Sequence, residues 1–315
     1  MFLLNHFWLF YAALALGLLL EVVWGEPRRW HPLVGFGRLA NAIEQRMNKK
    51  TMGIAAGTFS AIVLVAIPII IFLALKWILR DWAWLLDAWA LWFALGAKSL
   101  FAHVRAISTP LLAGDLPEAR QQLQWIVSRD CAQLSETEVA KGAIESNLEN
   151  GADAIFATLF WFALFGGAGA LLHRLANTLD AMWGYRTPRF NEFGRCAARL
   201  DDVLNFLPAR LVAVSYALLG NTQLAIKAWR TQARLWDSPN AGPVMAAGAG
   251  ALGLTLGGNA IYHGQVEVRT PLGFGPAPQA SDIARSLVLV QKTLALWLLC
   301  LLVLPLLIWL CKVWI

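Results

Sequence analysis

The sequence predicts an all-α fold, a polytopic integral membrane bundle of helices that forms a single domain over residues 1–315. Hydrophobic residues make up 58% of the chain and charged residues only 15%, whereas an average soluble domain is about 25% charged. Several apolar segments are long enough to cross the hydrocarbon core of a bilayer, which takes about 20 helical residues. Short polar islands separate these segments, and no linker or repeat divides the chain.

Four apolar segments are predicted to span the membrane: 7–24, 54–78, 82–101 and 287–315. Two further segments, 155–172 and 245–261, are shorter or rich in glycine. On composition they could be spans, re-entrant pieces or buried helices. The loop between the first two spans carries six Lys and Arg residues and two Glu residues, so we expect this loop to be cytoplasmic.

The net charge of +6 does not indicate a nucleic-acid-binding protein. A DNA-binding surface needs a soluble helix or strand that carries basic residues, and the sequence predicts none. We therefore expect no nucleic acid as a partner, and we expect the Lys and Arg residues to orient the chain in the lipid bilayer.

Local signals predict two helices in the polar stretch 103–150. Asp115 followed by Leu116 and Pro117 is typical of a helix start. A second helix should begin at Ser135, because Ser135 and Glu138 have the spacing of a capping box.

Charged residues recur at every fourth position of this second helix: Lys141, Glu145, Glu149 and Asp153. They share one face if the helix runs that far, and like charges at this spacing destabilise an isolated helix. The face could be solvated, or its acids could hold a divalent cation or a basic partner. Mg²⁺ is bound by one or two carboxylates together with substrate phosphates.

The densest polar island, residues 177–210, contains charges of both signs. Charges are costly beside lipid, so a membrane protein that gathers them in one place is expected to use them. Asn177 and Asp180 lie one turn apart on a first predicted helix, and Arg199 lies on a second helix that Pro208 should end. The charges could form salt bridges between buried helices, or the guanidinium groups could bind phosphate or carboxylate.

Gly248, Gly250 and Gly253 match the spacing of a dinucleotide-binding fingerprint, but no βαβ unit surrounds them. In an apolar segment, small residues usually allow helices to pack closely, and we adopt this interpretation. No Walker A sequence occurs, so any binding of ATP must use other groups.

Five polar islands follow one another along the chain. They are Gly25-Glu26-Pro27 with His31-Pro32 and Gly37, then Glu145-Ser146 with Glu149-Asn150, then Asn177-Thr178-Leu179-Asp180 with Gly184-Tyr185, then Ala198-Arg199-Leu200-Asp201-Asp202 with Pro208-Ala209-Arg210, and finally Ser238-Pro239-Asn240-Ala241-Gly242. In this order and with these apolar flanks, the chain resembles the CobD/CbiB family of membrane-bound cobalamin biosynthesis proteins over about residues 18–290. Glu26, where many relatives have Asp, is a small departure, as is the polar run after Glu149.

The resemblance implies an enzyme, the adenosylcobinamide-phosphate synthase, which is a ligase that forms a carbon–nitrogen bond. It would join aminopropanol, or aminopropanol phosphate, to a propionate side chain of adenosylcobyric acid, with ATP and Mg²⁺. A carboxylate is a poor acylating agent and must be activated, most simply as an acyl phosphate. This chemistry requires magnesium, cations that bind phosphate and a base for the incoming amine.

The islands contain all three kinds of group, and the resemblance suggests how to assign them. For magnesium binding we select four acids: Glu145, Glu149, Asp201 and Asp202. For catalysis, including handling of the amine, we select Glu26, His31, Asp180 and Arg199. For binding of substrate or phosphate we select Asn177, Arg199, Arg210, Ser238 and Asn240.

The same resemblance implies a multi-pass protein of the bacterial inner membrane with its active-site loops facing the cytoplasm, where ATP is. A single crossing at 155–172 would place Glu145 and Asp180 on opposite sides of the bilayer. We therefore expect 155–172 to be re-entrant or buried, and we expect the same of 245–261. Further expected partners are other late enzymes of corrinoid assembly and a second copy of the chain.

Two other classes of function stay open, an AmpE-like membrane signalling protein without known catalysis and a transporter. AmpE relatives lack the islands around Glu145, Arg199 and Ser238. Transporters often contain inverted repeats, and this sequence shows none.

Overall fold

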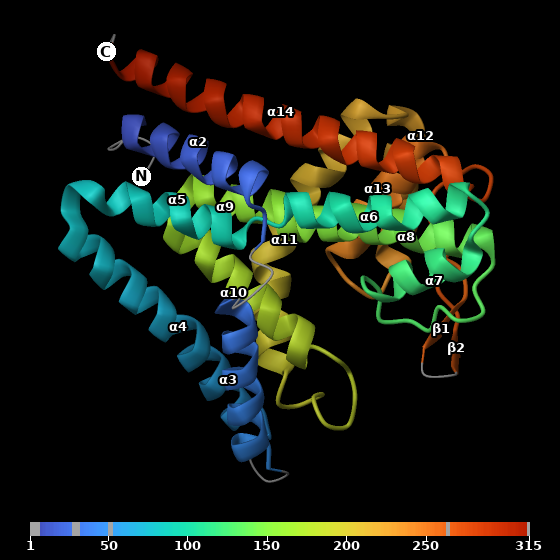
Figure 1. Ribbon diagram of the computed structural model, residues 1–315, viewed down its shortest axis with the longest axis horizontal. Coiled ribbons are helices and arrows are strands. Elements are labelled where there is room, and N and C mark those ends of the chain that lie inside the picture. The colour runs from blue at the N-terminus through green and yellow to red at the C-terminus, as the bar shows by residue number, and fades with distance from the viewer. Residues whose placement is uncertain (1–6, 27–31, 50–52, 263–264, 314–315) are drawn as a thin grey trace. The chain divides into compact units, whose positions relative to one another are not determined.

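The computed structural model describes residues 7–26, 32–49, 53–262 and 265–313, and these ranges are mostly helical, which confirms the predicted fold class (Figure 1). Two three-residue strands form one antiparallel hairpin, in which Ile261 lies opposite Val266. The elements, in chain order, are α2 (Phe7–Val23), α3 (Pro32–Met47), α4 (Gly53–Leu79), η1 (Arg80–Trp82), α5 (Ala83–Ala94), α6 (Ala97–Leu112), α7 (Leu116–Gln124), α8 (Glu136–Gly151), the π-helix η2 (Ala152–Ala157), α9 (Thr158–Phe165), α10 (Gly167–Trp183), α11 (Arg195–Leu219), α12 (Thr222–Gln232), η3 (Ala233–Leu235), α13 (Ala241–Leu252), β1 (Ala260–Tyr262), β2 (Gln265–Glu267) and α14 (Ala280–Val313).

Four stretches of the described chain are long and apolar enough to cross a membrane: Gly53–Leu112, Glu136–Phe165, Arg195–Leu219 and Ala280–Val303. They indicate a membrane protein. The first contains the predicted span 54–78, and the last overlaps the predicted span 287–315. The predicted span 7–24 corresponds to α2, which at 17 residues is shorter than these four.

The predicted span 82–101 is not one continuous helix, and its crossing of the membrane stays a prediction. α5 ends at Ala94, Leu95 adopts an extended backbone with a ψ of 127°, and α6 begins at Ala97. Gly96 occupies the break, and glycine is a poor helix former. The apolar composition is continuous here although the helix is not.

The prediction that Pro208 ends the helix is wrong, because α11 continues through Pro208 to Leu219. A proline inside a helix leaves the carbonyl four residues earlier without its usual donor. That carbonyl belongs to Leu204, and it accepts a hydrogen bond from Trp161 Nε1 at 2.9 Å. An indole from α9 therefore replaces the missing backbone donor.

The chain forms two compact units, each made of separate stretches of sequence. The first consists of Met1–Gly96, Ala157–Asn205 and Leu301–Ile315. Its core includes Phe93, Leu179 and the edge-to-face pair of Trp183 and Phe193, whose ring centroids lie 4.9 Å apart. The single domain predicted over 1–315 stays a prediction.

Within the first unit the chain reverses direction at Gly166, between α9 and α10. Gly166 has a φ of 63°, a region that glycine enters without steric cost. Thr158 of α9 and His173 of α10 lie side by side, with 3.3 Å between Oγ1 and Nδ1. Segment 155–172 is therefore not one straight helix, and its re-entrant or buried position in the membrane stays a prediction.

The second unit consists of Ala97–Phe156 and Phe206–Cys300. In it α6 packs beside α8, and α12 packs beside α13 (Figure 1). Every residue of α13 is buried. A Cβ on Gly248 would lie 2.7 Å from the Leu148 side chain, and one on Gly250 would lie 2.5 Å from the Leu224 carbonyl oxygen. The interpretation of these glycines as packing residues is confirmed, and segment 245–261 leaves the helix at Gly253.

Both predicted helix starts in the second unit are confirmed. The Asp115 carboxylate accepts a hydrogen bond from the Glu118 amide at 3.1 Å and begins α7. Ser135 and Glu138 form the reciprocal capping box that begins α8.

Candidate functional site

Three carboxylates of the first unit lie close enough to repel one another, and we call them the aspartate cluster. Asp180 comes from α10, and Asp201 and Asp202 come from α11. Asn177 donates its Nδ2–H to Asp201 Oδ1 at 3.2 Å, and Asn205 donates to Oδ2 at 3.0 Å. The structure therefore brings four residues predicted from the sequence together: Asn177, Asp180, Asp201 and Asp202.

Asp180 is the least compensated member of the aspartate cluster. Its carboxylate makes no hydrogen bond in the described part of the chain. Burial, followed by the negative charges of Asp201 and Asp202, raises the pKa of Asp180 to about 7. Gly184 leaves room for this carboxylate, because a Cβ there would collide with Asp180 Oδ1. A carboxyl group that titrates near neutral pH can exchange a proton with a substrate.

Hydrogen bonds connect the aspartate cluster to a buried histidine, His173. Its Nε2 lies 3.0 Å from Asn205 Oδ1, and its Nδ1 faces the Thr158 hydroxyl. Burial lowers the pKa of His173 to about 4, so the imidazole is neutral. The sequence analysis did not single out Asn205, Thr158 or His173 as site residues. The only local signal was the position of Asn205, four residues after Asp201.

Other residues predicted for catalysis have different surroundings. Glu26 forms an ion pair with Arg174, with 2.8 Å between Oε1 and Nη2. Arg199 is exposed on the face of α11 that carries Leu200, whereas Asp201 on the opposite face is buried. His31 lies outside the residues that the structure describes.

Glu145, in the second unit, is buried and surrounded by donors. Its carboxylate lies 3.1 Å from Arg129 Nη1 and 3.3 Å from Arg269 Nη2. It also accepts the Gly257 N–H at 2.8 Å. Of the alternatives for this helix face, the solvated face is wrong for Glu145, and the basic partner is confirmed as two arginines. Neither arginine has a sequence signal near Glu145, because they lie 16 and 124 residues away.

Gly257 also ties Lys141 to this arrangement, because its carbonyl accepts a hydrogen bond from Lys141 Nζ at 3.0 Å. Gly257 has a φ of 70°, which favours glycine. Lys141 and Glu145 therefore share a face of α8, as their spacing predicts. Asp153 follows in the π-helix η2, where the regular spacing changes.

Glu149 lines a small polar cavity of about 250 Å³ in the second unit. Ser238, Asp237 and Arg269 line the same cavity. Two residues predicted for the site, Glu149 and Ser238, thus come together although 89 positions separate them in the sequence (238 − 149). The Ser238 hydroxyl oxygen also accepts the Ala241 N–H at 3.1 Å, at the start of α13.

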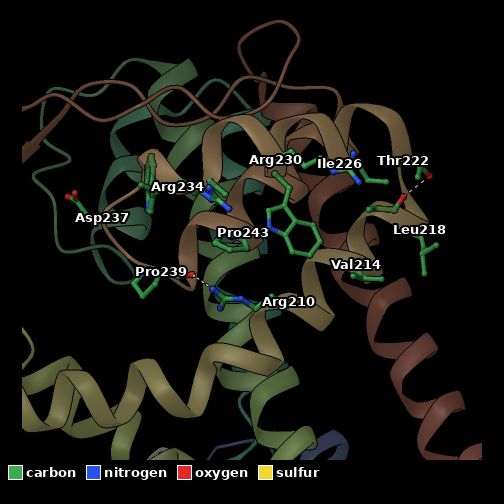
Figure 2. Close-up of a pocket in the computed structure, with 14 residues that line it drawn as sticks. Arg210, Val214, Leu218, Thr222, Ile226, Arg230, Arg234, Asp237, Pro239 and Pro243 are labelled. Atoms are coloured by element: carbon green, nitrogen blue, oxygen red, sulfur yellow. Dashed lines mark hydrogen bonds between the residues drawn. The ribbon is translucent and has the colours of Figure 1, made fainter.

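A larger cavity of about 750 Å³ shares Trp236 and Asp237 with the small cavity. Three arginines, Arg210, Arg230 and Arg234, line the larger cavity (Figure 2). Trp229 and Trp236 line it as well. Only Arg210 was predicted from the sequence. The volume of this cavity lies in the range typical of ligand pockets. Guanidinium groups are suited to binding phosphate and carboxylate groups.

Arg210 shapes the rim of this large cavity. Its Nη1 donates to Asn240 Oδ1 at 2.6 Å. Its Nη2 donates to the Pro239 carbonyl at 2.9 Å (Figure 2). The guanidinium plane lies 3.7 Å from the centroid of the Phe206 ring. Arg210 and Asn240, both predicted to bind substrate, are therefore in direct contact, and Arg210 fixes the loop before α13.

The carboxylates differ in how well they fit magnesium. In the described ranges, no three His, Cys, Asp or Glu side chains are placed to hold a metal ion. Mg²⁺ needs only one or two carboxylates when a substrate supplies phosphate oxygens, and a cation would relieve the repulsion in the aspartate cluster. Glu145 fits less well, because Arg129 and Arg269 already balance its charge. The metal roles of Glu145, Glu149, Asp201 and Asp202 stay predictions.

Comparison with known proteins identifies relatives along almost the whole chain. Residues 14–290 match the family model described as CobD/Cbib protein. The chain is 54% identical over 286 residues to "Cobalamin biosynthesis protein CobD" of Stutzerimonas stutzeri, with 90% of this chain and 94% of that protein covered. Proteins of the same name show 50% identity over 293 residues in Chromobacterium violaceum (90% and 93% covered) and 41% over 280 residues in Mycobacterium tuberculosis (87% and 89% covered). No solved structure gave a significant match.

The apolar helices, the aspartate cluster and the arginine-lined cavity define a helical membrane protein with one acidic and one basic site. The extent of the family match establishes the family of the protein. The chain belongs to the CobD/CbiB family of cobalamin biosynthesis proteins, as the polar islands suggested.

Proposed function

We propose that the chain is an ATP-dependent ligase that joins aminopropanol, or its phosphate, to a propionate side chain of adenosylcobyric acid. Membership of the CobD/CbiB family supports the pathway. The observation that carries the chemistry is Asp180, whose carboxyl group has a pKa of about 7 beside two further acids. An amine enters as an ammonium ion at neutral pH, so amide formation needs a group that can accept its proton.

ATP and Mg²⁺, when bound, would supply the activation of the propionate. Asp180 would accept the proton of the amine, while Asp201, held by Asn177 and Asn205, would attract positive charge. Asp202 would add to that attraction. The neutral His173 would fix Asn205, and through it the orientation of Asp201.

In the second unit, Arg210, Arg230 and Arg234 would bind the phosphate or carboxylate groups of a substrate in the large cavity. The indole rings of Trp229 and Trp236 offer flat apolar surfaces for a macrocycle. Glu149 and Ser238 would bind polar groups in the small cavity. The roles of Glu26, His31 and Arg199 in catalysis remain predictions from the resemblance.

We further propose that the protein lies in the bacterial inner membrane with these groups facing the cytoplasm. The basic loop before α4 supports this orientation, and ATP is available only on that side. Other enzymes of late corrinoid assembly are proposed as neighbours, because this product must be passed on for completion of the cofactor.

The test is direct: purified protein is incubated with adenosylcobyric acid and either aminopropanol or its phosphate, and the corrinoid products are identified by mass spectrometry. We expect a product with one added amine that depends on both ATP and Mg²⁺. A folded protein that binds the corrinoid yet forms no product with either amine would overturn the proposal. Comparison of the two amines identifies the donor.

A further inference from the structure

A third cavity, of about 530 Å³, lies in the first unit between α4 and α11. We call it the α4–α11 groove. The residues that line it are Ile54, Thr58, Arg195, Cys196, Arg199, Leu200 and Val203. A Cβ on Gly57 of α4 would collide with the carbonyl of Phe193, two residues before α11 begins. The start of α4 therefore packs closely against the segment that leads into α11.

Two arginines mark one side of this groove. Arg195 and Arg199 lie one helical turn apart, and both are exposed. Neither side chain makes an ion pair or a hydrogen bond in the described part of the chain, although like charges at this spacing repel each other. Glu192, three residues before Arg195, folds its carboxylate over Gly53 instead. The groove therefore presents two positive charges that have no ion-pair partner among the described residues.

The other wall of the groove is apolar and open. Ile54 is 47% exposed and Val203 is 70% exposed. Both belong to stretches that are long and apolar enough to cross a membrane, and these stretches begin at Gly53 and Arg195. The arginines thus lie in the first two turns of one such stretch, beside the first two turns of the other. In a membrane, this is the depth at which head groups meet acyl chains.

We infer that the α4–α11 groove binds an anionic phospholipid. Arg195 and Arg199 would bind the phosphate of the head group, and Ile54, Leu200 and Val203 would contact an acyl chain. Basic pockets between membrane helices bind anionic head groups in this way. A zwitterionic lipid carries a cation of its own, which would face the two arginines. This inference is independent of the proposed ligase reaction, because Arg199 faces away from Asp201.

The experiment measures lipid selectivity in the full-length protein, reconstituted in nanodiscs with spin-labelled phosphatidylglycerol or spin-labelled phosphatidylcholine. We expect the protein to prefer phosphatidylglycerol. In the double variant Arg195→Gln/Arg199→Gln, the preference for phosphatidylglycerol over phosphatidylcholine should fall at least five-fold. The matched control is Arg38→Gln/Arg46→Gln, which removes the same charge from exposed positions on α3 of the same unit. This control should retain the lipid preference of the wild type.

A second variant, Val203→Trp, keeps both arginines but fills the apolar part of the groove, and it should also reduce the preference. It serves as the test if the arginine variant fails to fold, as judged by gel filtration. The inference is overturned if the preference survives the groove variants, or if the α3 control reduces it equally. It is also overturned if inorganic phosphate at millimolar concentration abolishes it, since the site would then bind phosphate without an acyl chain.

Discussion

The aspartate cluster of the first unit and Glu145 of the second show two ways in which one protein can bury carboxylates. Glu145 is balanced by Arg129, Arg269 and the Gly257 amide. Asp180 is repelled by Asp201 and Asp202, and its carboxylate makes no ion pair or hydrogen bond among the described residues. Removing one partner of a paired buried charge destabilises the fold. A buried charge without a partner is itself destabilising, and such groups cluster at functional sites. The comparison therefore predicts which acids stabilise the fold and which take part in the proposed reaction.

The largest expected effect is on stability, from Glu145→Gln. This change would leave Arg129 and Arg269 buried with one charge partner fewer, and breaking a buried ion pair costs about 3–5 kcal/mol. Chemical unfolding in detergent would measure it. The matched control is Glu136→Gln at the exposed start of the same helix, which should change stability by less than about 0.5 kcal/mol. A stable but inactive Glu145→Gln would instead restore the predicted metal role and break the comparison.

The opposite outcome is expected for Asp180→Asn. Loss of a general base typically reduces the rate by about 10²-fold to 10⁴-fold, and this carboxylate makes no hydrogen bond that the change would remove. Activity should fall while the melting temperature stays equal or rises, because one repelling charge is gone. Ligase assays and thermal unfolding of the same preparation would show this pattern. Normal turnover by the variant would remove Asp180 from the mechanism.

A smaller loss is expected from Arg210→Lys, because lysine cannot copy the fork that binds Asn240 and Pro239. We expect kcat/KM to fall by about ten-fold or more. Arg230→Lys is the control: Arg230 lines the same cavity, is exposed, and should tolerate the change better. Equal effects of the two changes would mean that Arg210 acts only through its charge.

The last expected effect is a pH dependence of stability. The pKa of Asp180 is raised from 3.8 to about 7 in the folded protein, so the folded state binds a proton that the unfolded state has already released. Stability should therefore fall as pH rises from about 4 to about 7. Melting temperatures across this range should show the decline in the wild type and a weaker one in Asp180→Asn. Identical slopes would assign the decline to other groups.

How far the sequence predicts the molecule depends on the distance over which each feature is encoded. The helix starts at Asp115 and Ser135 are local, and both were predicted correctly. The break at Leu95 and the continuation of α11 through Pro208 were not predicted. The first interrupts a uniform apolar run, and the second depends on a donor from Trp161, 43 residues away from the Leu204 carbonyl that it reaches.

The candidate sites follow the same rule. Asn177 and Asp180 share a helix with one-turn spacing, so their grouping could be predicted, and the resemblance added Asp201 and Asp202. The arginines beside Glu145 come from positions with no pattern in common with it. Arg230 and Arg234 lie in a helix and turn that no motif marked, and only the folded chain shows that they share a cavity with Arg210.

The discontinuous composition of the first unit has a consequence for how a cell makes the protein. Its stretches 1–96, 157–205 and 301–315 leave the ribosome at the beginning, the middle and the end of synthesis. The Tyr11 hydroxyl of the first helix donates to the Leu302 carbonyl at 2.7 Å. This contact can form only after residue 302 has been synthesised. No single truncation of the gene would yield either unit whole. The newly synthesised helices need protection in the membrane until translation ends.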